Sequence, residues 1–279
     1  IHIFPVPMEV EQMLVNYKGD IRPGDIFLHN DPYSGGTHLN DIALISPLFH
    51  DNKMVVFPVV RAHWADVGGT NPGSISGKNT EIHHDGLRIP ITRIARENKV
   101  NNEIIDFLVS NMRLSDDRKG DFYAMLATCN TGHKRLIELG KKYGWKLISK
   151  TVETLLKNSE LSMKKRIQEL PQGEFHFEHF MDHTGQNLKP VRIRASAKKI
   201  KDKLFIDFDG TDMQSESAYN VGPSMAPSAA FTIIKAFLDP KSPINHGVFR
   251  VLNIKIEKGT LLSANYPASC AGSMEVTHA

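Results

Sequence analysis

The pattern of apolar and polar positions predicts an amphipathic helix and then a group of short strands at the start of the chain. Apolar residues recur at spacings of three and four across residues 6–17, which is the period of a helix with one buried face. An Arg-Pro-Gly-Asp run at residues 22–25 ends this pattern. Three short apolar runs follow, and an Asp-Asn-Lys turn between the last two predicts a hairpin. These runs are residues 26–28, 42–49 and 54–60.

Apolar residues recur at helical spacing in the middle of the chain, and apolar and polar residues alternate towards its end. Apolar positions at helical spacing return three times before a Pro-Gln-Gly run at residues 171–173. Beyond that run, several segments alternate apolar and polar residues, as the strands of a half-solvated antiparallel sheet do. The predicted helices are residues 102–113, 121–143, 149–170 and 226–238, and the predicted strands are residues 174–181, 191–197, 203–209 and 251–256.

These elements predict an α+β fold with a soft boundary near Pro171. Residues 1–170 would form a mixed α/β region with a loop-rich site and a helical segment, and residues 171–279 a mainly antiparallel sheet region. The chain begins with Ile-His-Ile instead of Met and has no polar tail at either end. We therefore expect it to be a fragment of a longer polypeptide.

Composition narrows the class of protein but not its activity. The 34 basic and 31 acidic residues nearly balance, and no basic stripe is interleaved with aromatic residues, which argues against a nucleic-acid partner. Two cysteines far apart favour a reducing cytoplasm over a disulfide framework. No apolar run approaches the length of a membrane span. We expect a soluble, cytoplasmic protein that binds neither nucleic acid nor membrane.

The loop NDPYSGGTHLND at residues 30–41 carries the clearest chemical signal. Its Asp-Pro and Gly-Gly pairs favour sharp turns, and it ends on His38 and Asp41. Imidazole nitrogens and carboxylate oxygens bind divalent metals, and catalytic metal sites often use three protein ligands. His63, delivered by the strand-like run before it, is the natural third ligand. The alternative is that His38 and Asp41 cap local turns and His63 is a hydrogen-bonded core histidine.

Other polar residues are weaker candidates. Asp31 and Asp66 lie in the same two loops and could orient a ligand imidazole or act as a general base, but stabilisation of Asx-type turns explains them equally well. His83, His84 and Asp85 could approach the site, but we expect them to lie in an exposed loop. Cys129 and His133 stand four apart on a predicted helix, where a buried cysteine is expected instead of a metal ligand. No Gly-Lys-Ser or Gly-Lys-Thr follows the glycine pairs, so ATP is expected to bind elsewhere.

Three ordered motifs are similar to signatures of the hydantoinase B family. They are NDPYSGGTHLNDI at residues 30–42, RAHWADVGGTNPGSI at residues 61–75 and HHDGLRIP at residues 83–90. Similarity continues through short segments as far as residues 243–247, so it spans nearly the whole chain. The family includes N-methylhydantoinase B subunits, the equivalent half of 5-oxoprolinase and the metal-carrying subunits of acetone and acetophenone carboxylases.

The resemblance implies the same three metal ligands, His38, Asp41 and His63. It also implies a metal-containing subunit of an ATP-dependent hydrolase of cyclic amides such as a hydantoin, oxoproline or lactam. A hydantoinase A-like partner would bind ATP-Mg and phosphorylate the substrate carbonyl oxygen in a hetero-oligomer. Zinc or manganese would activate water, and Asp66 or Asp31 would accept the proton.

Two alternatives to the hydrolase remain. One is the metal subunit of an ATP-dependent ketone carboxylase, and the other is a non-catalytic scaffold that completes the partner's active site. The sequence departs from the commoner family pattern at Asn40 and at residues 83–85, which leaves the substrate open.

Overall fold

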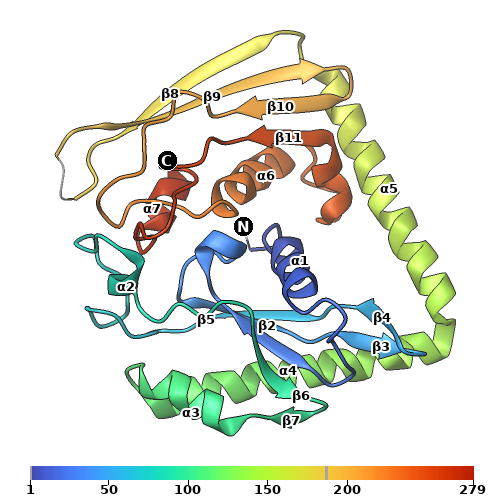
Figure 1. Cartoon of the computed structure of the whole chain (residues 1–279). Coiled ribbons are helices and arrows are strands. Elements are labelled where there is room, and N and C mark those ends of the chain that lie inside the picture. Colours follow the sequence, from blue (N-terminus) through green and yellow to red (C-terminus); the bar gives the residue numbers. More distant parts are fainter. Residues whose placement is uncertain (1, 186–187) are drawn as a thin grey trace.

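A five-stranded and a four-stranded sheet, connected by a pair of long helices, organise this α+β chain (Figure 1). The computed structural model describes residues 2–185 and 188–279. The long helices are α4 Ser115–Tyr143 and α5 Trp145–Glu169, and they meet at a corner where Gly144 has a positive φ of 77°. A side chain other than hydrogen is strained in that conformation, so glycine suits the sharp change in direction.

The first sheet has five antiparallel strands in the order β5-β2-β1-β6-β7. Figure 1 shows α4 on one side of this sheet and α1 on the other. The bounds are β1 Ile26–His29, β2 Asp41–Ile45, β5 Val59–His63, β6 Thr92–Arg96, β7 Lys99–Val100, α1 Val6–Asn16 and α3 Asn102–Ser110. A separate hairpin joins β3 Leu48–His50 to β4 Lys53–Val56.

Alternate residues of the first sheet fill two different cores, because successive side chains of a strand point to opposite faces. Ile42 and Leu44 pack with Phe122 of α4 in the largest core. Ile45 packs with Met13 of α1 on the opposite face. Both faces of this sheet are therefore covered, and the site described below lies at the edge of the face that α1 covers.

The second sheet holds four strands in the order β11-β10-β9-β8. The strands β8, β9 and β10 are antiparallel, whereas β10 and β11 are parallel. The bounds are β8 Glu174–Met181, β9 Val191–Ile200, β10 Lys203–Asp207, β11 Leu252–Lys255 and α6 Met225–Leu238. The short elements are η1 Pro32–Ser34, α2 Ile82–Asp85, η2 His246–Val251 and α7 Ser273–His278.

The two parts of the chain share packing on both sides of residue 171. Met163 and Ile167 of α5 belong to the same core as Leu204 of β10. Near the N-terminus, the ring centroid of Phe4 lies 4.4 Å from the ring centroid of Phe231 in α6. The division into residues 1–170 and 171–279 stays a prediction.

The sequence predicted the main elements and missed the small ones. The helices at residues 6–17, 102–113, 121–143, 149–170 and 226–238 are confirmed, with shifted ends. The apolar runs 42–49 and 54–60 are each two strands, interrupted at Pro47 and Pro58. Proline cannot donate a ladder hydrogen bond, which explains both interruptions. The elements that the sequence did not predict include β6, β7, α2 and α7.

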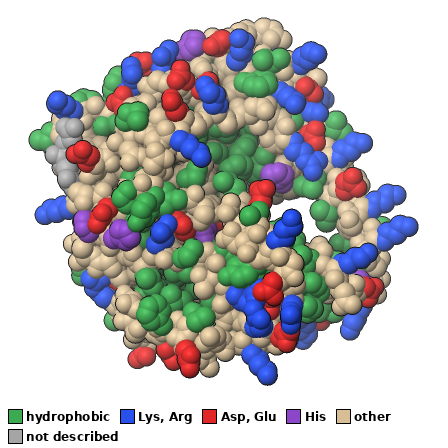
Figure 2. Space-filling model, viewed as in Figure 1, with side chains coloured by type: hydrophobic (Ala, Val, Ile, Leu, Met, Phe, Trp, Pro, Cys, Tyr) green, Lys and Arg blue, Asp and Glu red, His purple; other side chains and the backbone are tan. Residues whose placement is uncertain are grey.

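The surface carries charges of both signs. On the face that Figure 2 shows, lysine and arginine side chains are interspersed with aspartate and glutamate. Among the described helices, none combines the length and the hydropathy that a membrane crossing requires. The cytoplasmic location stays a prediction.

We expect Phe122→Ala to lower the free energy of unfolding by about 3–5 kcal/mol, because it leaves a cavity in the core beneath the first sheet. Phe122 is fully buried. Phe107→Ala is the control, since that ring is 65% exposed and surface changes stay within about 0.5 kcal/mol. Urea unfolding of both variants measures the difference. Equal stability of the two would contradict this packing.

Candidate metal centre

The antiparallel pairing of β2 with β5 places two of the three predicted ligands face to face. Asp41 is the register partner of His63. Directly opposed residues of an antiparallel pair have side chains on the same face with Cβ atoms about 5 Å apart. His38 lies one turn before β2, and the N–H of Asp41 donates to its carbonyl oxygen at 3.0 Å. This turn directs His38 back towards Asp41.

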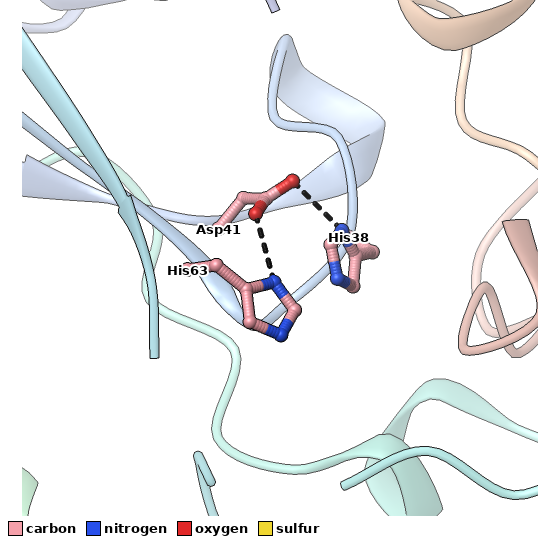
Figure 3. A group of neighbouring side chains, drawn as sticks. All are labelled: His38, Asp41 and His63. Atoms are coloured by element: carbon pink, nitrogen blue, oxygen red, sulfur yellow. Dashed lines mark hydrogen bonds and ion pairs between the residues drawn. The ribbon is translucent and has the colours of Figure 1, made fainter. Parts of the chain in front are cut away.

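The three side chains converge (Figure 3). Nδ1 of His38 lies 2.8 Å from Oδ2 of Asp41, and Nδ1 of His63 lies 3.2 Å from Oδ1 of the same carboxylate. One ligand atom from each residue lies within 4.8 Å of the others. Ligand atoms bound to one zinc ion at about 2.1 Å lie roughly 3.4 Å apart, so small side-chain adjustments suffice. The sequence-based grouping of His38, Asp41 and His63 is thus matched by proximity, and metal binding itself stays a prediction.

The hydrogen bonding of His38 fits a metal ligand better than a capping residue. The residue is 4% exposed, Nδ1 contacts Asp41, and Nε2 has no hydrogen-bond partner among the described residues. Buried polar atoms in proteins nearly always have such a partner or bind an ion. Asp41 is 2% exposed, whereas His63 is exposed at the rim. A divalent cation would satisfy His38 while leaving an open side next to His63.

Asp41 is held in its charged form. Burial acts to raise the pKa of its carboxyl group, but contact with His38 and the hydroxyl of Thr37 outweighs burial, and the pKa lies far below its ordinary value. Thr37 donates to Oδ2 of Asp41 at 2.5 Å. A carboxylate that is ionised at neutral pH is the form that binds a metal.

Sequence reasoning missed two residues beside Asp41. The imidazole Nδ1 of His2 lies 3.5 Å from Oδ2 of Asp41, and its side chain is 45% exposed. Thr37 immediately precedes His38, so its position in the loop could have indicated a contact with the predicted ligands. No local pattern connects His2 with a carboxylate 39 positions later, because the contact depends on how the N-terminal segment packs through Phe4.

The loop that carries His38 is fixed by backbone contacts. Gly35 has a φ of 109°, and a Cβ on Gly36 would lie 2.7 Å from the carbonyl oxygens of Asn30 and Asp31. The hydroxyl of Ser224 donates to the carbonyl oxygen of Gly36 at 2.5 Å. Two consecutive glycines are thus required for different reasons, one for its dihedral angle and one for close approach.

Asp31 and Asp66 lie outside the three-residue cluster. Asp31 accepts a hydrogen bond from the N–H of Tyr33 and forms an ion pair with Arg88 at 3.2 Å. Asp66 accepts from the N–H groups of Gly68 and Gly73, both at 2.8 Å. These contacts fix the two loops, and the general-base role stays a prediction.

Asp66 also pairs with Arg113, at 3.1 Å. Burial acts to raise the pKa of Asp66, but the backbone hydrogen bonds from Gly68 and Gly73 and the contacts with Arg113 lower it overall. A lowered pKa makes a carboxylate a weaker base.

The remaining candidates have structural partners. The expectation of an exposed loop at residues 83–85 is wrong for Asp85, which is buried at the end of α2 and accepts hydrogen bonds from Asn79 and from the backbone of Cys270, while residues 83 and 84 lie nearer the surface. Cys129 is buried, as expected, and burial raises its pKa to about 11. His133 contacts Ser46 at 3.0 Å instead of joining a metal cluster.

Comparison with known proteins gives a family-level match over the full length of the chain. The family model described as hydantoinase B/oxoprolinase matches residues 1–279. An uncharacterised protein of Methanocaldococcus jannaschii is 32% identical over 259 residues, which are 92% of this chain and 45% of that protein. This chain therefore spans less than half of that relative.

Two solved structures have the same fold. The ATP-dependent caprolactamase of Pseudomonas jessenii matches with a TM-score of 0.92 and 24% identity, over 97% of this chain and 47% of that one. A nucleotide-free acetone carboxylase matches with a TM-score of 0.87 and 19% identity, over 99% of this chain and 38% of that one. At these identities the similarity establishes the fold alone.

We expect Gly36→Ala to destabilise the protein by about 1–3 kcal/mol, because the new methyl group would overlap two carbonyl oxygens. Gly132→Ala is the matched control. Gly132 lies inside α4, and no atom lies within 4 Å of the position that a Cβ would occupy, so alanine there should stabilise the helix by up to about 1 kcal/mol. Thermal unfolding of both variants measures the contrast, and an unaffected Gly36→Ala protein would argue against this loop conformation.

We expect the effect of Asp66→Asn on stability to depend on pH. Because the folded-state pKa of Asp66 is lowered, its charged form stabilises the fold above the unfolded-state pKa of about 4, and that contribution is lost as the pH falls further. The variant should lose about 1–3 kcal/mol at pH 7 and progressively less below about pH 4. Urea unfolding across this range measures the loss, with Asp51→Asn, whose side chain is 86% exposed, as the control. A loss that is independent of pH would contradict the charged network.

Proposed function

Because the chain belongs to the hydantoinase B/oxoprolinase family, we propose that it forms the metal-binding part of a subunit of an ATP-dependent hydrolase of cyclic amides. The substrate would be a hydantoin, oxoproline or lactam. Relatives of this chain include the beta subunit of a caprolactamase, the B subunit of a D-/L-hydantoinase, a 5-oxoprolinase and the delta subunit of an acetophenone carboxylase. The family therefore contains ATP-dependent amide hydrolases and ketone carboxylases.

The observation that carries the proposal is the convergence of His38, Asp41 and His63 on one point at the end of two paired strands. Two imidazoles and one carboxylate are the donor set of many catalytic zinc sites. Bound there, zinc or manganese would supply the positive charge that activates water or polarises a carbonyl oxygen near neutral pH.

The residues around the cluster have distinct tasks in this proposal. Asp41 contacts both histidines, and the hydrogen bond from Thr37 holds its carboxylate in the orientation that these contacts require. Buried His38 would form the inner wall, and exposed His63 would border the side that substrate approaches. Hydrogen bonds to a ligating residue, such as the one from Thr37 to Asp41, orient metal ligands and tune their affinity for the metal.

We further propose that a hydantoinase A-like partner binds ATP-Mg and phosphorylates the carbonyl oxygen of the substrate. The names of several relatives as beta, delta or B subunits support a hetero-oligomer. Phosphorylation converts an amide, which is a poor electrophile, into an activated imidate that water can attack. This chain would then act on the intermediate that the partner forms.

A ketone carboxylase subunit is the second candidate. The acetophenone carboxylase delta subunit of Aromatoleum aromaticum is 25% identical over 99% of this chain. Bicarbonate dependence of ATP turnover in the assembled complex distinguishes the two candidates, because bicarbonate is a substrate of a carboxylase.

We expect His38→Ala to remove near-stoichiometric zinc or manganese from the purified protein and to lower the activity of the assembled complex several hundredfold, or about 3–4 kcal/mol of transition-state stabilisation. The measurements are elemental analysis and ATP-dependent turnover. His83→Ala is the control, because His83 contacts Tyr266 and lies outside the cluster.

The outcomes separate the proposal from a scaffold role. Chelator-free wild type that contains no metal would refute the metal centre. A His38→Ala complex with nearly full activity would identify this chain as a non-catalytic scaffold.

A further inference from the structure

The guanidinium group of Arg61 is buried with more hydrogen-bond donors than acceptors around it. Its side chain is 9% exposed, and Nη2 lies 2.5 Å from Oε2 of Glu9. Nε and Nη1 have no hydrogen-bond partner among the described residues. Glu9 is shared, because its Oε1 lies 3.0 Å from Nδ1 of His29. The single carboxylate thus leaves part of the guanidinium unsatisfied.

Arg61 lies next to the metal cluster. It precedes His63 by two positions on β5, so the two side chains leave the same face of the sheet with their Cα atoms about 7 Å apart. Its register partner is Ala43, two positions after Asp41 on β2. The small side chain of Ala43 leaves room above the strand for the long arginine. Arg61 is the permanently charged residue of β5, two positions before His63.

A second basic side chain, His2, lies at the exposed rim of the same cluster. His2 itself lies 3.5 Å from Asp41. Asp41 therefore contacts a basic side chain from the N-terminal segment, and Arg61 leaves the same face of the sheet as Asp41.

An unsatisfied guanidinium is not by itself a binding site. Arg118 of α4 is also buried, with Nη2 3.0 Å from Asp121, and its Nε and Nη1 also lack partners among the described residues. Arg118 lies on the helix that covers the opposite face of the first sheet. What distinguishes Arg61 is its place beside His63 and Asp41.

We propose that Arg61 binds an oxyanion of the reacting molecule at the edge of the metal cluster. This inference rests on the proposed function, which requires either a phosphoryl group on the substrate or bicarbonate at this site. Arginine suits both, because its planar guanidinium offers several fixed N–H donors and is always charged. Glu9 holds the guanidinium in place through Nη2, and the oxyanion oxygens accept from Nε and Nη1.

The test compares anion binding by zinc-loaded wild type and Arg61→Lys in the full-length protein. Lysine keeps the positive charge next to Glu9 and removes the planar donor set. Arg118→Lys makes the same change at a buried, acid-paired arginine away from the cluster. Calorimetric titrations with inorganic phosphate and with bicarbonate give the affinities, and elemental analysis and thermal unfolding report metal content and fold.

We expect Arg61→Lys to weaken the binding of one anion by about tenfold or more, with unchanged metal content, while Arg118→Lys binds like wild type. Loss of phosphate affinity identifies a phosphoryl group as the ligand, and loss of bicarbonate affinity identifies a carboxylase-type ligand. Equal affinities in wild type and Arg61→Lys, or no binding of either anion to wild type, would overturn the role of Arg61.

A second variant covers the case in which Arg61→Lys does not fold. Glu9→Gln with Arg61→Gln removes both charges together and leaves no unpaired ion. It should retain zinc and lose the anion, and unchanged anion binding would again overturn the proposal. Wild type that binds the anion through Arg61 but holds no metal would refute the metal centre alone.

Discussion

The register between β2 and β5 is the constraint on which the candidate site depends. Asp41 faces His63 only when Ile42 faces Ala62 and Leu44 faces Val60. A shift of one residue would move a whole set of side chains to the other face of the sheet. It would remove apolar residues from the core that they now form with α4, so the hydrophobic core beneath the sheet enforces the geometry of the polar cluster at its end.

The face that α1 covers changes character along its length. Near Met13 it is an ordinary apolar core, and near Glu9, one turn of helix away, it becomes a buried polar layer in which Glu9 pairs with Arg61 and contacts His29. Buried charges are stable only when they are paired, and removing one partner is far more costly than keeping both. This layer connects α1, β1 and β5 beside the strand end that carries His63, so it supports the site as well as the fold.

Residue types and spacing were sufficient to group His38, Asp41 and His63, because both flanking signals were local. The glycine pair marked a tight loop, and the apolar run before His63 marked a rigid strand. The strand β6, Thr92–Arg96, went unpredicted because two arginines and a threonine in five residues obscure its alternation. The ion pair of Asp66 with Arg113 could not be foreseen, since Arg113 reaches Asp66 from 47 positions away. Long-range contacts of this kind leave no trace in periodicity.

The hydrogen bond from Ser224 to Gly36 joins residues 188 positions apart, and Gly222 approaches Pro32 in the same region. A ribosome releases the loop that contains His38 long before it releases α6. During synthesis, the ligand loop therefore remains without its final backbone partner until most of the chain has emerged. Contacts so distant in sequence form late in folding. Acquisition of a metal ion would thus be coupled to completion of the fold, and an interrupted chain would carry the ligands without the shaped site.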